Sequence, residues 1–347
     1  MSRLYFTTSS NLSLISCTLV LLIGGCVPRP ENEVVVYSAL DQEFAAPILS
    51  SFDRHVDGEI KVNARFDIES TKTIGLVNRI LAERDRPVCD LFWNNEIIHT
   101  VRLQKEGLLQ PIDWPVDSVW PDGCIASDGT WCGFAARARI LIVNRDLLPD
   151  EDQWPTSILD LADPKWKDQC AIARPLFGTT ATHFAVLENH FGKEEAEALF
   201  RRIHDNAVTV SGNKQVAQAV SSGRIAWGLT DTDDAVIERD LGLSVDIIFP
   251  DQQPDQMGTL RIPNTLAVLK DAPHPVAAEQ LALFLMSPET EMRLAMGNSA
   301  QIPLYRGVKH QPRVLPSQSV RWMKPNFEQA AEAWETLADR LNAIYVD

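Results

Sequence analysis

The chain has 347 residues, of which 45% are hydrophobic and 23% are charged, and the formal net charge is −15. These proportions are those of a globular protein and exclude a disordered chain, while the length suits two domains. The lysines and arginines form no run, so the sequence predicts no nucleic-acid partner.

The N-terminus has the features of a bacterial export signal. Residues 12–23 are mostly apolar, but the stretch is too short for a comfortable transmembrane helix and it ends in two glycines. Cys26 follows these glycines directly, as a lipidated cysteine follows the small residues of a lipobox. We predict a lipoprotein signal peptide at residues 1–25, a tether at residues 26–33 and lipidation of Cys26. The alternative is an ordinary signal peptide with an incidental cysteine.

The first hundred residues after the tether alternate between short apolar runs and amphipathic helical patterns. Strands are predicted at residues 34–37, 60–62 and 90–93, and helices at residues 44–52, 71–84 and 97–106. This alternation of strands and helices indicates a parallel, doubly wound α/β sheet.

The remaining elements continue the α/β pattern. Strands are predicted at residues 131–134, 140–143, 171–173, 225–229 and 259–269, and helices at residues 159–162, 179–191, 194–204, 214–221, 235–241, 275–286 and 327–344. Four cysteines belong to this folded part. We predict that Cys89 and Cys170 are buried thiols, whereas Cys124 and Cys132 flank a hairpin-like turn, and their pairing stays open.

The apolar run at residues 225–229 ends in a cluster of acids, Asp231, Asp233 and Asp234. In open α/β sheets, ligands bind outside the carboxyl ends of the strands. The three carboxylates therefore either hold a cation or a polar solute, or cap the helix that follows. We expect Asp233 or Asp234 to cap that helix in any case, because an acid there complements the helix dipole.

Several segments resemble the ferric-ion-binding family of periplasmic solute-binding proteins. The resemblance rests on residues 131–144 and 159–167, with support from residues 34–37 and 284–289. These segments occur along the chain in the same order as in the family. It implies a type II periplasmic binding protein fold, in which two doubly wound lobes are joined by crossing strands and close on a ligand in the cleft between them. The implied lobes are residues 34–138 with 262–310 and residues 139–261 with 311–347.

The resemblance also places the ligand site, but with altered residues. Iron-binding members use two adjacent tyrosines at the positions of Asp233 and Asp234, a histidine at Asp41 and a glutamate at Asn95, next to Glu96. Every ligand position of the iron pattern is therefore changed. Carboxylate and amide oxygens suit harder or larger cations, or they form hydrogen bonds with an organic solute.

Two further features complete the candidate site. Thr179 and Thr180 open a helix after a strand, where free N–H groups make an anion seat, as the family's synergistic-anion site implies. Arg137 and Arg139 share one face of a strand, so either of them reaches an anion or pairs with the acids. The candidate ligand-binding residues are Asp41, Asn95, Glu96, Arg139, Thr179, Thr180, Asp231, Asp233 and Asp234, with Asp41, Asp231 and Asp233 as metal candidates.

The resemblance implies an extracytoplasmic solute-binding lipoprotein, anchored by its lipid to a bacterial membrane, that feeds the permease and ATPase of an ABC importer. Its solute is expected to be a metal ion or a small anionic or organic molecule, such as an organophosphonate. No cofactor is required, although iron or another metal with a synergistic anion stays open. A sensory module and a secreted enzyme are the alternatives from other classes. No nucleophile elbow, zinc-helix motif or Walker loop occurs, so we predict no catalytic residue.

Overall fold

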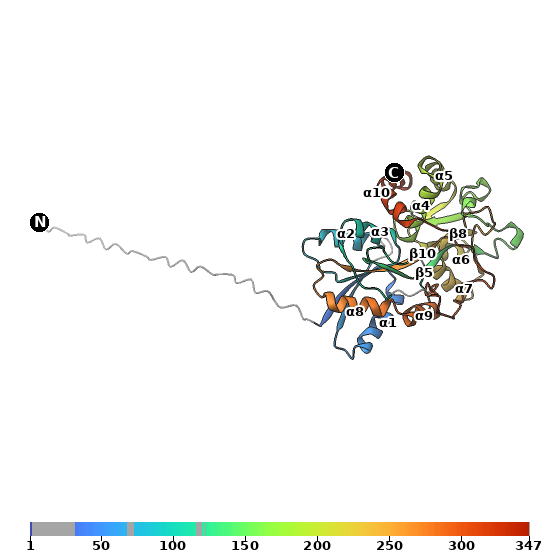
Figure 1. Cartoon of the computed structure of the whole chain (residues 1–347). Coiled ribbons are helices and arrows are strands. Elements are labelled where there is room, and N and C mark those ends of the chain that lie inside the picture. The colour runs from blue at the N-terminus through green and yellow to red at the C-terminus, as the bar shows by residue number, and fades with distance from the viewer. Residues whose placement is uncertain (2–31, 68–72, 116–119, 122, 347) are drawn as a thin grey trace. The chain divides into compact units, whose positions relative to one another are not determined.

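The computed structural model (Figure 1) describes residue 1 and residues 32–67, 73–115, 120–121 and 123–346. The predicted signal peptide, most of the tether and Cys26 lie outside these residues, apart from Met1. Residues 1–31 and 32–347 form separate units, and the following concerns the second unit alone. Within the described part of the chain, no helix is long and apolar enough to cross a membrane.

The first half of the unit contains the predicted parallel strands. The strands are β1 (Glu33–Ser38), β2 (Lys61–Phe66) and β3 (Leu91–Asn94), and the helices between and after them are α1 (Gln42–His55), α2 (Ile74–Ala82) and α3 (Ile98–Lys105). The strands lie in the order β2-β1-β3, and all three run parallel. Strand β10 (Arg261–Leu269) then pairs antiparallel with β3, and the two-residue strand β4 (Leu109–Gln110) pairs with β10.

Strand β5 (Cys132–Asn144) is buried along its whole length and connects the two halves of the sheet. Its first half pairs with β10, as far as Ala138 opposite Arg261, and its second half pairs with β8 and β9, starting with Arg139 opposite Asp231. A buried crossing strand of this kind is the joint that the type II binding-protein fold requires. The predicted lobe boundaries themselves stay a prediction.

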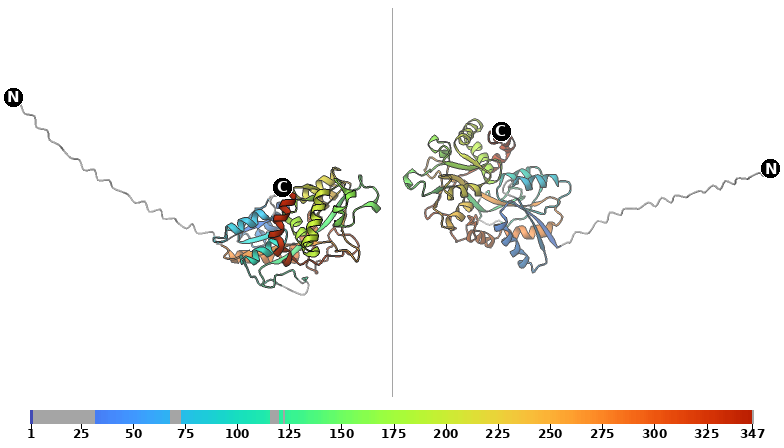
Figure 2. Two further views of the ribbon diagram at one scale, coloured as in Figure 1. Left: turned by 90° about the horizontal axis from the view of Figure 1, so that it is seen from above. Right: turned by 180° about the vertical axis from the view of Figure 1, so that it is seen from behind.

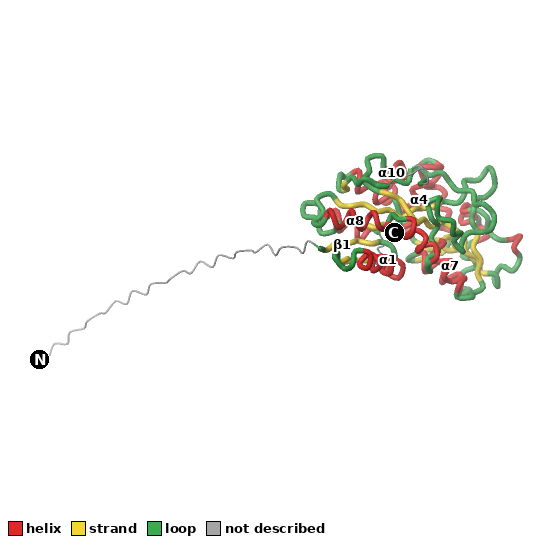
Figure 3. The backbone as a smooth tube through the Cα atoms, turned by 60° about the horizontal axis from the view of Figure 1, so that its bottom comes forward, coloured by secondary structure: helices red, strands yellow, loops and turns green. Residues whose placement is uncertain are grey.

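The second half has its own parallel strands. Its elements are β6 (Cys170–Ala173), α4 (Gly178–Phe191), α5 (Lys193–Asn206), β7 (Val208–Val210), α6 (Asn213–Ser221), β8 (Trp227–Asp231), α7 (Thr232–Asp240) and β9 (Val245–Ile248). The 3-10 helices η2 (Glu151–Gln153), η3 (Ile158–Ala162) and η4 (Pro164–Trp166) precede β6. Strands β8, β6 and β7 are parallel neighbours. Figure 3 shows the yellow strands at the centre with red helices around them.

The C-terminal helix α10 (Phe327–Tyr345) contacts both halves of the unit, whereas α8 (Pro275–Leu285) and α9 (Pro288–Met296) lie with α1. In the left view of Figure 2, α10 is the red helix between the helices of the first half and those of the second. Trp334 packs edge-on against His99 of α3, and Arg340 pairs with Glu188 of α4 at 2.7 Å. The C-terminal helix therefore spans the junction between the halves.

Some details differ from the sequence prediction. The sequence predicts none of β4, β7, β9 and α9, because each is short and only part of its surface is buried. Strand β8 continues to Asp231, two residues beyond the apolar run, and α7 begins at once. Cys89 and Cys170 are buried thiols, as predicted, and Cys132 is also a buried thiol, so the disulfide that was left open is not formed.

Candidate functional site

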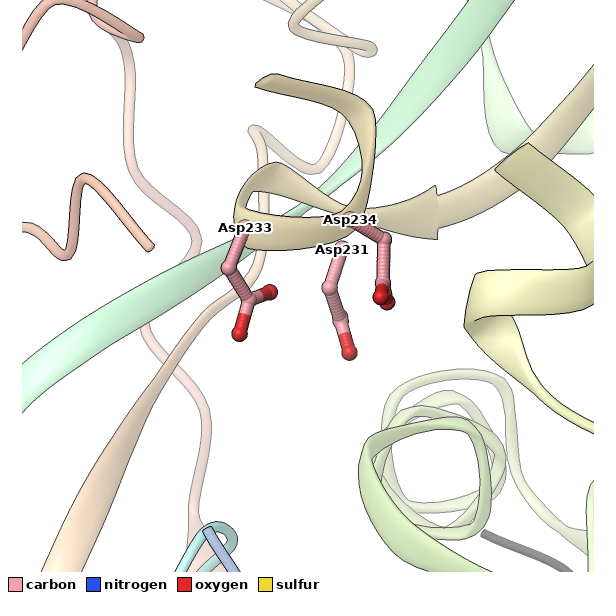
Figure 4. Close-up of side chains that lie close together, drawn as sticks. All are labelled: Asp231, Asp233 and Asp234. Carbon is pink, nitrogen blue, oxygen red and sulfur yellow. The ribbon is translucent and has the colours of Figure 1, made fainter. Parts of the chain in front are cut away.

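The three acids lie at the junction between β8 and α7, as the sequence predicts. Asp231 is the last residue of β8 and the N-cap residue of α7, but its side chain makes no capping hydrogen bond. Asp233 and Asp234 lie in the first turn of the helix. In Figure 4 all three side chains leave this junction and point to the same side of it. The junction thus presents three carboxylates to one region.

A glycine in β8 permits the close packing that holds this junction in place. A Cβ atom on Gly228 would lie 2.5 Å from Cγ1 of Val216 in α6 and 2.8 Å from the carbonyl oxygen of Ala171 in β6. Both distances are shorter than any ordinary contact, so only glycine lets β8 approach α6 and β6 this closely. The start of α6 is thereby brought next to the end of β8.

Asp231 is the centre of a buried hydrogen-bond network. Arg139 Nη1 donates to Asp231 Oδ1 at 2.7 Å, Asn213 Nδ2 donates to Oδ2 at 3.0 Å, and Thr179 Oγ1 donates to the same oxygen. Arg139 also donates to Thr180 Oγ1 at 3.2 Å. Four sequence-distant elements, β5, α4, α6 and β8, therefore meet at one carboxylate.

The other arginine of β5, Arg137, pairs with the next acid along the chain, Asp233. Arg137 Nη2 lies 3.3 Å from Asp233 Oδ2, and both side chains are buried. Burial lowers the pKa of Arg137, but the charges of Asp233, Asp231, Asp41 and Asp234 outweigh burial and raise it above its usual value. Of the two alternatives that the sequence left open for these arginines, the structure shows pairing with the acids. Since each arginine balances one carboxylate, only part of the negative charge of the cluster is left for a cation.

One carboxylate oxygen from each of Asp231, Asp233 and Asp234 lies within 4.8 Å of the others. This spacing is close enough for a shared cation. Hard cations, however, need several oxygen ligands with negative charge, and here two of the carboxylates are already paired with arginine. The arrangement can therefore accept hydrogen bonds from a solute as well as hold a metal ion.

The other side of the network is formed by the starts of two helices. α4 follows Phe177 and α6 follows Gly212, and neither N-cap residue supplies a side-chain capping bond. Thr179 and Thr180 lie in the first turn of α4, where the sequence predicts an anion seat. Backbone N–H groups and the helix dipole favour an anion at such a position.

A small cavity lies between these helix starts. Its lining includes Asn95, Arg174, Ser211 and Asn213, together with the threonines of α4 and Asp231. Its volume is about 20 Å³, which is room for about one water molecule. A larger solute therefore requires the two halves of the unit to separate here.

The structure separates the predicted pair Asn95 and Glu96. Asn95 lines the cavity, and its Oδ1 accepts a hydrogen bond from Thr73 Oγ1 at 2.9 Å. Glu96 is fully buried and accepts from Ile98 N at 2.7 Å, His99 Nδ1 at 3.0 Å and Thr182 Oγ1 at 2.8 Å. Burial raises the pKa of Glu96, but the charge of His99 and these hydrogen bonds outweigh burial and lower it. Glu96 thus holds the start of α3 and joins it to α4.

Asp41 is the N-cap residue of α1, as the sequence suggests, but its side chain makes no capping bond. Its charge acts on Arg137, so it belongs to the acidic cluster electrostatically. Close by, Lys214 of α6 pairs with Glu43 of α1 at 3.3 Å. Together with the bond between Glu96 and Thr182, this pair links the two halves across the candidate site.

The candidate set omitted two residues that the structure brings into the site. Asn213 bonds to Asp231, Arg139 and Thr179, and Arg174 lines the cavity. Asn213 carried a signal in the sequence, since Ser211-Gly212-Asn213 reads as a turn before a helix. Arg174 carried none, because its role depends only on where β6 ends relative to α4.

Comparisons with known proteins fit this geometry. Residues 97–329, about two thirds of the chain, match the family described as bacterial extracellular solute-binding protein. The Fe(3+)-binding periplasmic protein of Serratia marcescens is 26% identical over 227 residues, which is 65% of this chain and 65% of that protein. Iron uptake protein A1 of Synechocystis sp. is 24% identical over 306 residues, 83% of this chain and 82% of that protein.

Solved structures show the same fold. The apo ferric ion-binding protein A of Pasteurella haemolytica is 22% identical, covers 91% of this chain and 99% of its own, and has a TM-score of 0.78. The periplasmic binding protein AfuA of Actinobacillus pleuropneumoniae, with fructose-6-phosphate bound, is 18% identical at a TM-score of 0.78, over 91% of this chain and 99% of its own. The fold is therefore that of the type II periplasmic binding proteins, and the chain belongs to the bacterial extracellular solute-binding protein family.

Proposed function

We propose that this protein is the solute-binding component of an ABC importer and that it captures a small organic anion bearing hydroxyl groups. One observation carries the choice of solute: the acid at the end of β8, Asp231, is already paired with Arg139 and is surrounded by hydroxyl and amide groups. Such a site offers a solute both hydrogen-bond donors and hydrogen-bond acceptors, rather than a concentrated negative charge. The membership of a solute-binding family supports the transport role.

The anionic end of the solute is assigned to the starts of α4 and α6. Two helix N-termini favour negative charge by about 0.3–1 kcal/mol each when exposed and by more when partly buried. The guanidinium of Arg174 adds donors around the same cavity, next to the hydroxyl groups of Thr179 and Thr180. A phosphate or carboxylate group fits this set of donors.

The hydroxylated end is assigned to the acids at the start of α7. Asp233 and Asp234 stand on the same side of the junction as Asp231 (Figure 4), and a carboxylate held by an arginine accepts hydrogen bonds from solute hydroxyls. In the described part of the chain, the buried Nε groups of Arg137 and Arg139 have no hydrogen-bond partner. A buried unsatisfied N–H costs about 1–3 kcal/mol, so solute oxygens that reach these groups stabilise the complex.

A metal ion with a synergistic anion is the second candidate. The spacing of the three carboxylates favours it, and relatives carry names such as Fe(3+)-binding periplasmic protein. In this case Asp231, Asp233 and Asp234 supply the ligands, and the anion occupies the helix starts. The ion would then compete with Arg137 and Arg139 for the carboxylates.

Native mass spectrometry of the purified protein tests the proposal directly, because a co-purified solute appears as a mass difference. Thermal unfolding with fructose 6-phosphate, citrate, Fe(III) alone and Fe(III)-citrate then ranks the classes. A solute at 100 times its Kd adds about 2.7 kcal/mol to stability. Stabilisation by Fe(III) but by neither organic anion without metal rejects the organic-anion proposal in favour of the metal site.

Two variants separate the candidates further. Thr179→Val removes a hydroxyl group beside the anion seat, and we expect it to weaken the binding of an organic anion about tenfold, which corresponds to 1.4 kcal/mol. Asp233→Asn keeps a hydrogen-bond acceptor but removes charge, so it weakens the binding of a metal ion far more than the binding of an organic anion. Asp150→Asn, in the exposed turn before η2, is the matched control and leaves the affinities for a metal ion and for an organic anion unchanged.

The setting in the cell is also part of the proposal. We assign lipidation to Cys26 and place the protein at the outer side of a bacterial membrane, where it delivers solute to a permease driven by an ATPase. Metabolic labelling with a fatty acid, compared between the natural chain and Cys26→Ser, tests the anchor. Labelling that persists in Cys26→Ser contradicts it. Neighbouring permease and ATPase genes support import, and a hydrolase cluster in their place contradicts it.

A further inference from the structure

A second pocket lies on the other face of the crossing strands. Its volume is about 340 Å³, and it is lined by Arg261 at the start of β10, by Pro121 and by the loop at residues 302–315. Arg261 stands opposite Ala138 of β5, and directly opposed residues of an antiparallel pair share a face. Successive residues of a strand alternate between faces, so Arg261 lies on the face opposite to Arg137 and Arg139.

The polar side chains around this pocket are mostly basic. Arg261, Arg306, Lys309 and His310 line it, and no aspartate or glutamate lines it among the residues that the structure describes. This is unexpected in a chain with a net charge of −15. Within the same described residues, none of the four side chains forms an ion pair or a side-chain hydrogen bond, although Arg261 stacks on Trp322 at 4.9 Å.

The charges near Arg261 do not compensate for its burial. Burial lowers the pKa of this guanidinium, Arg306 lowers it further, and Cys124 and Glu291 act against that shift without reversing it. The carboxylate of Glu291 accepts hydrogen bonds from the backbone N–H groups of Ala135 and Tyr305, each at 2.7 Å. It therefore holds the loop in place rather than serving as a direct partner for Arg261.

The walls of the pocket are fixed at both ends. Ile302 exchanges two backbone hydrogen bonds of 2.7 Å with Ala136 of the crossing strand. At the far end, Arg313 donates to Asp240 of α7 and to the carbonyl oxygen of Gly297, each at 2.7 Å. The cationic side chains therefore project from a constrained segment.

We propose that this pocket binds a small soluble polyanion of the phosphate or polycarboxylate class. Three cationic side chains and a histidine, with no carboxylate among the described lining residues, attract negative charge, and arginine matches phosphate and carboxylate geometry with paired N–H donors. The volume lies at the lower end of the range of small-molecule sites. A membrane surface is disfavoured as the source of the phosphate, because the protein and an anionic bilayer repel each other overall.

Isothermal titration of the purified mature chain with pyrophosphate at low salt tests the site. We expect Arg306→Gln/Lys309→Gln, which alters two exposed loop residues, to weaken binding at least tenfold, and Arg261→Gln to do the same. Lys193→Gln, at an exposed lysine of α5, is the charge-matched control for Arg261→Gln and leaves the affinity unchanged. Added salt is expected to weaken binding in the parent chain.

The variant Thr179→Val tests whether pyrophosphate binds at the candidate site of the first proposal instead of at this pocket. Pyrophosphate binding that survives Thr179→Val but not Arg306→Gln/Lys309→Gln supports the pocket, whatever the fate of the proposed function. Binding lost in Thr179→Val and retained in the loop variant overturns the pocket. Binding of vesicles with anionic phospholipid headgroups in place of pyrophosphate, or no binding of any small anion, overturns it as well.

Discussion

Replacing Asp231 with alanine tests whether the network at the end of β8 holds the two halves of the candidate site together. The change removes the partner of Arg139, whose side chain is fully buried, and the acceptor of bonds from Thr179 and Asn213. The guanidinium then stays in the interior with hydroxyl and amide oxygens as its remaining partners. We therefore expect a large loss of stability.

The magnitude follows from the burial of both partners. Removing one member of a buried ion pair costs about 3–5 kcal/mol, because the other charge is left without compensation. An exposed pair at helical spacing contributes only about 0.3–0.5 kcal/mol. Glu289 and Arg293 form such an exposed pair, at 2.6 Å, in α9. Glu289→Ala is therefore a matched control in which a similar distance but a different environment predicts a small effect.

Urea unfolding followed by circular dichroism measures both variants. A lower midpoint with an unchanged m-value reports a loss of stability rather than a change in the exposed surface. A loss below about 1 kcal/mol for Asp231→Ala would refute the reasoning, since an interior guanidinium must then find solvent or another partner easily. Replacing both partners in Arg139→Met/Asp231→Leu should restore much of the stability.

Three other predictions concern single features. Gly228→Ala should cost at least about 1–3 kcal/mol by overpacking, and Val216→Ala in the same chain should recover part of that loss in urea unfolding; a neutral Gly228→Ala contradicts the close approach of β8 to α6. The folded-state pKa of Glu96 lies below its unfolded value, so its contribution to stability is present above about pH 4.3 and is lost as pH falls through the folded pKa. Stability of the parent measured from pH 6 to pH 3 should thus fall more steeply than that of Glu96→Gln, and equal slopes refute this assignment. Thr182→Val removes the bond from α4 to Glu96 and should raise the rate of hydrogen exchange at the start of α3, while Thr336→Val, on the exposed face of α10, should not.

The sequence alone was sufficient for the class of fold and for the location of the acidic cluster. Both depend on local pattern: the β-α alternation, the apolar run that ends at Asp231, and the alternation that places Arg137 and Arg139 on one face. The alternation left open whether these arginines reach an anion or the acids, and the structure shows that they pair with the acids. The lipid anchor and the identity of the solute remain predictions.

Tertiary structure decided which of the candidate residues face a solute. Asn95 and Glu96 are neighbours in the chain, yet Asn95 lines the cavity while Glu96 is saturated by donors from α3 and α4. The cationic pocket likewise joins Arg261 to a loop some forty residues later. Local spacing encodes the periodicity of one element, whereas these contacts depend on the register between strands and on the packing of helices that are distant in sequence. Only the folded chain therefore determines which charges are paired and which are left to bind a ligand.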